Sequence, residues 1–81
     1  MTKWMTFAEV GLVEMNRIVA VGRADSAPMQ RLIQQTAADR IVMLTGGRRR
    51  QSVLVLDSGH LVITAVCINE LLQRLEARNL K

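Results

Sequence analysis

The chain of 81 residues is poor in the side chains that build disulfides, metal sites and catalytic centres. It has one cysteine, Cys67, and one histidine, His60, so it lacks the residues for an internal disulfide or for the usual Cys/His zinc sets. No Ser/His/Asp set has usable spacing. We therefore expect a protein that is not an enzyme, with no catalytic residue, no metal site and no cofactor. Cys67 is predicted to be a small buried hydrophobe, and His60 to hydrogen-bond in a turn or at a strand end.

Aromatic side chains are almost absent. Trp4 and Phe7 are the two that occur, and there is no tyrosine. Proteins that bind single-stranded nucleic acids through RRM or OB folds rely on aromatic rings on which unpaired bases stack. If a nucleic acid is the partner, we expect double-stranded DNA that is held through its phosphates.

Long apolar runs are missing as well. The longest nearly unbroken run, Leu61–Ile68, contains Thr64 and is far shorter than the ~20 residues that span a bilayer. Glu9 and Glu14 interrupt the apolar stretch that a signal peptide would need. Together with an unpaired cysteine, these features predict a cytoplasmic protein with no membrane partner.

The net charge of +4 is concentrated in one segment, because positive and negative side chains balance in residues 1–39 and again in residues 51–81. Nine of the eleven basic residues are arginine, whose planar guanidinium matches phosphate oxygens in a bidentate way. The segment therefore indicates either a polyanion partner or a solvated turn. The residues that carry the surplus are Arg40, Arg48, Arg49 and Arg50.

The first half of the chain predicts a hairpin followed by a helix. Two short strands over residues 7–13 and 16–22 are rich in apolar and β-branched residues. Ser26 is a good N-cap residue, and Pro28 suits the first turn of a helix over residues 27–38. The apolar stripe of this helix consists of Met29, Leu32, Ile33, Thr36 and Ala37, and its outward face presents Gln30, Arg31, Gln34 and Gln35.

A second hairpin is predicted at Gly46-Gly47. The runs 41–45 and 48–56 flank this pair, and the tight turns that join two strands need residues with positive φ. Gly47 is therefore assigned a structural role. Alternation along the second strand would place Arg48 and Arg50 on one face and Arg49 on the other.

A turn over residues 57–60 and a strand over 61–66 follow. The last element is a helix that begins near Ile68, because leucines recur there at helical spacing. An ion pair between residues four apart, Glu70 and Arg74, is expected on its outer face.

These elements define a small α+β domain of order ββαβββα, with a mainly antiparallel sheet and two amphipathic helices. The domain is expected to occupy residues 7–78, after a lead-in over residues 1–6 and before a tail over residues 79–81. Strands that are apolar on both faces need cover on both, and only two short helices are available. We therefore expect a homo-oligomer, in which the arginines repeat around a closed assembly.

Short segments recur in a characteristic order and spacing between Val13 and Leu75. None is distinctive alone. They are Asn16-Arg17, Ser26-Ala27-Pro28, Gln30-Arg31, Ile33-Gln34, Asp39-Arg40, Thr45, Gly47-Arg48-Arg49, Asp57-Ser58, His60 and Ala65-Val66.

In this order the segments resemble the RemA-type bacterial regulators of extracellular-matrix and biofilm genes, and the chain is similar to a divergent member. The resemblance implies a DNA-binding protein of α+β fold that assembles into a closed ring. It assigns DNA binding to Arg17, Arg48 and Arg49, to which Arg50 adds a further charge here. It also attaches importance to Pro28, for which we predict a structural role in starting the helix.

Two other functions stay open on the sequence alone. The first is a structural or adaptor oligomer whose basic hairpin docks an acidic protein or a membrane surface. The second is an effector-sensing module for a phosphorylated small ligand.

Overall fold

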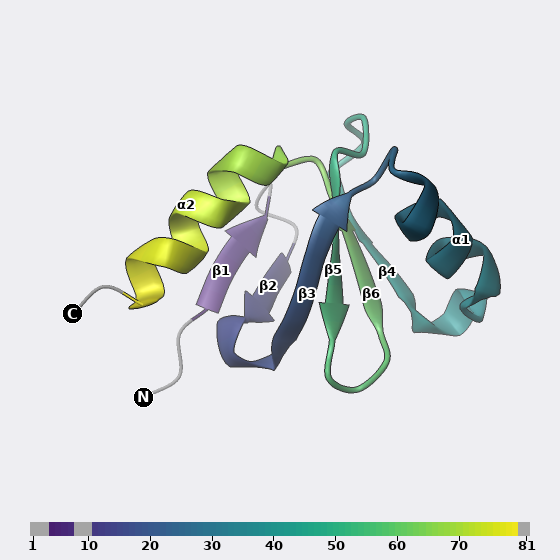
Figure 1. Ribbon diagram of the computed structural model, residues 1–81, viewed down its shortest axis with the longest axis horizontal. Coiled ribbons are helices and arrows are strands. Elements are labelled where there is room, and N and C mark those ends of the chain that lie inside the picture. Colours follow the sequence, from purple (N-terminus) through teal and green to yellow (C-terminus); the bar gives the residue numbers. More distant parts are fainter. Residues whose placement is uncertain (1–3, 8–10, 80–81) are drawn as a thin grey trace.

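The structure is a computed structural model that describes residues 4–7 and 11–79 (Figure 1). No helix in these ranges is long and apolar enough to cross a membrane. The strands are β1 (Trp4–Phe7), β2 (Gly11–Glu14), β3 (Ile18–Arg23), β4 (Ile41–Leu44), β5 (Ser52–Leu56) and β6 (Leu61–Thr64); the helices are α1 (Ala27–Gln35) and α2 (Ile68–Asn79), with short 3-10 helices η1 (Met15–Arg17) and η2 (Ala38–Arg40).

The strands form two sheets. β1 and β2 make a small antiparallel pair, and the other four form a sheet of order β3-β5-β6-β4. Within the larger sheet, β5 is antiparallel to both of its neighbours, whereas β4 runs parallel to β6. The α+β class with two helices is confirmed, and the order of elements becomes βββαβββα, with one strand more than predicted.

The first predicted hairpin is wrong. Phe7 ends β1, which starts at Trp4 inside the expected lead-in, residues 11–13 lie in β2, and Trp4 pairs with Glu14. β3 does not continue this hairpin but pairs with β5 in the other sheet. The physical reason lies in η1, which buries Met15 and redirects the chain from the small sheet to the large one.

The second predicted hairpin is also wrong, although its local signal is real. Gly46 and Gly47 adopt φ values of 63° and 83°, as the sequence predicts. The turn at residues 57–60 folds β6 back onto β5, so β6 occupies the edge that β4 would need. β4 lies on the far side of β6, and residues 45–51 cross the end of β6 as a loop. We call these residues the arginine loop.

The large sheet is covered on both faces. One face packs against α1 through a cluster that includes Val53, Leu61 and Ile63. The other packs against the β1–β2 hairpin and α2 through a cluster that includes Leu54 and Val62 (Figure 1). Neighbouring residues of β5 and β6 therefore point into opposite clusters, which explains why these strands are apolar throughout.

Some apolar surface nevertheless stays exposed. Val19 is 64% exposed on β3 and Met43 is 55% exposed on β4, the two outer strands of the large sheet. Among the described residues, the other exposed large apolar side chains are Trp4, Leu12, Val42 and Leu72.

Both helices lie where the periodicity predicts them. α1 begins after Ser26, whose hydroxyl donates to the carbonyl of Arg23 at 2.8 Å rather than capping the helix, and Pro28 lies in the first turn. The helix ends at Gln35 instead of residue 38, because Thr36 leaves the helical conformation.

Candidate functional site

The arginine loop lies at one end of the large sheet, above β5 and β4 in Figure 1. Backbone hydrogen bonds close a turn inside it and tie its last residue to the sheet. The N–H of Arg48 donates to the carbonyl of Thr45 at 3.1 Å within the loop, and the N–H of Gln51 donates to the carbonyl of Thr64 at 2.8 Å. The carbonyl of Gln51 accepts from Ala24 at 3.0 Å, so the loop is tied to β6 and to the chain before α1.

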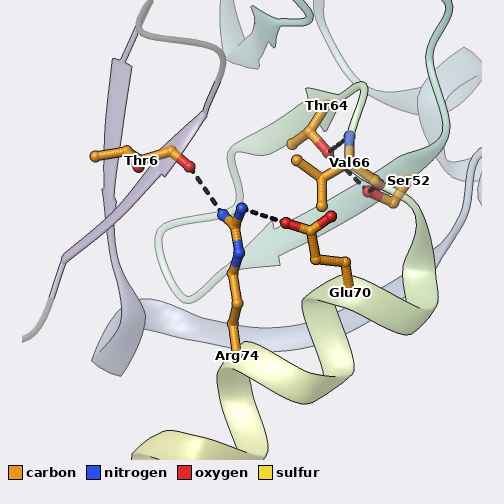
Figure 2. Close-up of polar contacts among 6 residues, drawn as sticks. All are labelled: Thr6, Ser52, Thr64, Val66, Glu70 and Arg74. Atoms are coloured by element: carbon orange, nitrogen blue, oxygen red, sulfur yellow. Dashed lines mark hydrogen bonds and ion pairs between the residues drawn. The ribbon is translucent and has the colours of Figure 1, made fainter.

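A closed set of buried hydrogen bonds lies directly beneath the loop (Figure 2). The Ser52 hydroxyl donates to the carbonyl of Val66 at 2.7 Å, and the Val66 N–H donates to the Thr64 hydroxyl at 3.2 Å. The two hydroxyls are 2.7 Å apart, and because Ser52 has used its proton, Thr64 is the donor between them. Both side chains are fully buried, so this ring of bonds anchors the first residue of β5. Sequence reasoning missed it, although two hydroxyl residues in apolar strands were its signal.

The three loop arginines are exposed, and among the described residues none of them forms an ion pair. Contrary to the prediction of strand alternation, they precede β5 and face two different clefts. Arg48 lines a cleft beside α2, the α2 cleft. Arg49 and Arg50 line a cleft beside α1, the α1 cleft.

The α2 cleft has a volume of about 460 Å³ and includes Arg74, Glu70 and Cys67. Arg74 donates to the Thr6 carbonyl at 3.0 Å and pairs with Glu70, as Figure 2 shows, so it joins α2 to β1. The predicted Glu70–Arg74 pair is confirmed. Cys67 is exposed, so its prediction as a buried hydrophobe is wrong: β6 ends at Thr64, and Cys67 lies on the surface just before α2.

Arg17 lies at the opposite end of the large sheet. Its guanidinium is 3.5 Å from the carboxylates of both Glu14 and Asp57, and its carbonyl accepts from the Asp57 N–H at 2.9 Å. The length of β5, about 17 Å at the usual rise per residue, separates this site from the arginine loop. Within one chain, Arg17 and the loop arginines are therefore not brought together.

Arg40 also lies at the far end. A β-carbon placed on Gly59, in the turn between β5 and β6, would come within 3.4 Å of the Arg40 guanidinium. The cluster of charge seen in the sequence is thus divided in space, and the arginine loop alone keeps three adjacent cations.

The single histidine has a local role. His60 Nδ1 is 2.7 Å from the hydroxyl of Ser58 in the same turn, which confirms the predicted turn hydrogen bond. In the described ranges, no three His, Cys, Asp or Glu side chains are grouped so that they could hold a metal ion.

Known proteins share the sequence pattern of this chain over most of its length. The pattern of the family described as extracellular matrix regulatory protein A-like, or RemA-like, matches residues 9–75. A protein of Halalkalibacterium halodurans is 37% identical over 70 residues, 84% of this chain and 79% of its own length. One of Brevibacillus brevis is 39% identical, with 84% and 80% covered, and one of Alkaliphilus oremlandii is 40% identical, with 84% and 74% covered. The names of all three suggest a regulatory role and state no enzymatic one.

Proposed function

Because the chain belongs to the RemA-like family, whose members include proteins named for regulation, we propose that it binds double-stranded DNA as a transcriptional regulator or DNA-organising protein. One observation carries the proposal. Arg48, Arg49 and Arg50 are exposed on an anchored loop, and among the described residues no carboxylate neutralises them. Guanidinium groups in this state favour phosphate oxygens.

The contact is proposed to be with the phosphate backbone rather than with bases. The loop carries arginines but no aromatic ring, and neither helix is part of a helix-turn-helix unit, since three strands separate them. Phosphate contacts position a protein on DNA and give binding that depends steeply on salt and weakly on sequence. Three arginines on one copy would bind weakly, so the affinity must come from several copies.

We therefore propose a closed homo-oligomeric ring. The exposed apolar residues Val19 and Met43 lie on opposite outer strands of the sheet, which supports a contact between unlike surfaces of neighbouring copies. Repeated head-to-tail contacts of this kind close into a ring when the rotation between copies allows it. A ring repeats the arginine loop and raises the effective concentration of its cations along one duplex.

Arg17 is proposed to contact DNA only in the assembled protein. It lies at the far end of its own sheet, so it reaches the same duplex only where one copy places that end beside the arginine loop of another. Replacing Arg17 by alanine should then weaken DNA binding by the assembled protein, while the mass of the assembly stays unchanged.

Titration of random-sequence duplex at several salt concentrations tests the function. The logarithm of the binding constant should fall with the logarithm of salt by about 0.9 per phosphate neutralised. The double variant Arg48→Ala, Arg49→Ala should bind more weakly on every duplex and show a shallower slope. Arg40→Ala is the charge-matched control for each single variant, Arg48→Ala and Arg49→Ala, because it too removes one charge but from the far end. Unchanged binding by an assembled double variant would contradict the proposal.

Two further measurements separate DNA binding from an adaptor role. Light scattering with and without duplex reports the mass of the assembly and of its complex. Binding to anionic lipid vesicles or to an acidic protein, without any shift of duplex, would instead favour docking through the arginine loop.

A further inference from the structure

The α1 cleft is one of the two clefts that the loop arginines line. Its volume is about 420 Å³, within the range of about 300–1,000 Å³ that small-molecule sites usually have. α1 supplies one wall, and Arg49 and Arg50 supply the other. Duplex DNA is too broad to enter a cleft of this size, whereas a small ligand fits it.

The charge of the cleft selects an anion. Arg49 and Arg50 have no ion-pair partner within the described ranges. The one carboxylate in the lining, Asp25, is 2.9 Å from the guanidinium of Arg23 and is therefore compensated. Two guanidinium groups on one wall match the oxygens of a phosphate.

The wall that α1 contributes adds a different chemistry. Gln30 and Gln34 are four residues apart, so their side chains lie one above the other on the same face of the helix. Both are exposed, and in the part of the chain that the structure describes neither side-chain amide makes a hydrogen bond. An amide offers a donor and an acceptor side by side, the pattern that pairs with the edge of a purine base.

Ile33 and Ala24 add apolar surface to the lining of the cleft. A flat base can rest on such a surface while its edge meets the amides and its phosphate meets the arginines. The three parts of the cleft thus match the three parts of one kind of ligand.

We propose that the α1 cleft binds a purine nucleotide, with Arg49 and Arg50 on the phosphate and Gln30 and Gln34 on the base. The binding itself does not depend on the proposed function. Its consequence does: the nucleotide occupies Arg49, which the duplex also needs, so nucleotide and DNA oppose each other reciprocally. The site would make DNA binding responsive to a small effector.

Isothermal titration of the full chain without DNA tests the site directly. The probes are the 5′-monophosphates of adenosine and guanosine, the two nucleosides, and inorganic phosphate. At least one nucleotide should bind at least about tenfold more tightly than its nucleoside and than phosphate, because only the nucleotide engages both walls. Binding of neither nucleotide, or binding no tighter than that of phosphate, would overturn the proposal.

Variants test the contribution of each wall to nucleotide binding. Arg50→Gln should weaken nucleotide binding by about tenfold to a hundredfold, and the double variant Gln30→Leu, Gln34→Leu by about fivefold to tenfold. Arg48→Gln is the matched control, because this arginine belongs to the same loop but lines the α2 cleft. All of these side chains are exposed, and circular dichroism checks that each variant folds. An equal loss in Arg48→Gln would reduce the site to unspecific charge attraction and contradict the proposal.

Competition with duplex separates this inference from the proposed function. If nucleotide binds and DNA does not, the site stands and the proposed function fails. If DNA binds and no nucleotide does, the reverse holds. If both bind, nucleotide should lower the affinity for duplex in the unaltered protein and much less in Arg50→Gln. Binding of both without mutual effect would reject the shared use of Arg49.

Discussion

The two ends of the large sheet carry the same kind of side chain in opposite electrical settings. At one end, Arg17 lies 3.5 Å from two carboxylates, Glu14 and Asp57. At the other end, Arg48, Arg49 and Arg50 stand together with no carboxylate paired to them among the described residues. Nearby carboxylates compensate part of the charge of a paired arginine, whereas an unpaired arginine offers its full charge to an incoming anion.

The same residue type therefore has different roles at the two ends of the sheet. Arg17 contacts Asp57 through both its carbonyl and its guanidinium, so it links η1 to the turn between β5 and β6. The loop arginines hold nothing in their own chain. Among the described residues they are three adjacent arginines without an ion pair, and the buried bonds of Ser52 and Thr64 keep the end of their loop in position.

Reversing the charge of the loop arginines should have the largest effect on duplex affinity. The double variant Arg48→Glu, Arg49→Glu is expected to lose duplex affinity by at least on the order of a hundredfold at low salt, because it replaces attraction by repulsion at each phosphate contact. Among single variants, which change the charge equally, Arg40→Glu at the far end should lower the affinity much less than Arg48→Glu. Fluorescence anisotropy with a labelled duplex measures both. Equal losses would mean that net charge, and not the loop end, determines binding.

Removal of the buried hydroxyl beneath the loop should have the next largest effect. Ser52→Ala leaves the Thr64 hydroxyl and the Val66 carbonyl without their buried partner, which should lower the free energy of unfolding by about 1–3 kcal/mol. Ser58→Ala is the control at the far end, where the bond to His60 is exposed and the loss should be smaller. Urea denaturation compares the two. A larger loss at Ser58 would show that the loop end is not the better anchored one.

A smaller change is expected at the turn of the arginine loop. A β-carbon on Gly47 would meet no atom within 4 Å, so Gly47→Ala introduces no clash and tests the positive φ alone. The expected cost is about 1 kcal/mol in the free energy of unfolding. Thermal denaturation measures it. A stabilising substitution would imply that the loop does not hold this backbone conformation.

The smallest effect on stability is expected at Arg17. Its ion pairs are long and its side chain is 60% exposed, so Arg17→Ala should lower the free energy of unfolding by less than about 1 kcal/mol. Urea denaturation at low and high salt checks this, because exposed pairs weaken as salt is added. A loss of several kcal/mol would make Arg17 a main structural support instead.

Local patterns were enough to predict the helices. The spacing of Met29, Leu32 and Ile33 predicted α1, and that of Ile68, Leu71 and Leu75 predicted α2. Both patterns depend on residues within a few turns of each other. The turn at residues 57–60 was found for the same reason.

Strand pairing was not predictable in this way. Gly46-Gly47 has the positive φ values of a hairpin turn, yet β4 and β5 are not neighbours, because β6 from further along the chain lies between them. A pattern of consecutive residues carries no information about which later strand occupies an edge.

The candidate site was predictable in kind but not in arrangement. Composition identified the arginines and their preference for phosphate. It did not separate Arg48 from Arg49 and Arg50, which face different clefts, nor place Arg40 and Arg17 at the far end. These placements follow from the order of the strands in the sheet, so they could not be predicted when the strand pairing was wrong.

The parallel pairing of β4 with β6 also bears on synthesis of the chain. Residues 41–50 are translated before the strand with which β4 pairs, since β6 begins at Leu61. The basic segment therefore cannot take its place in the sheet until residues 61–64 have also been made. Its final shape is acquired only when a later part of the message has been translated.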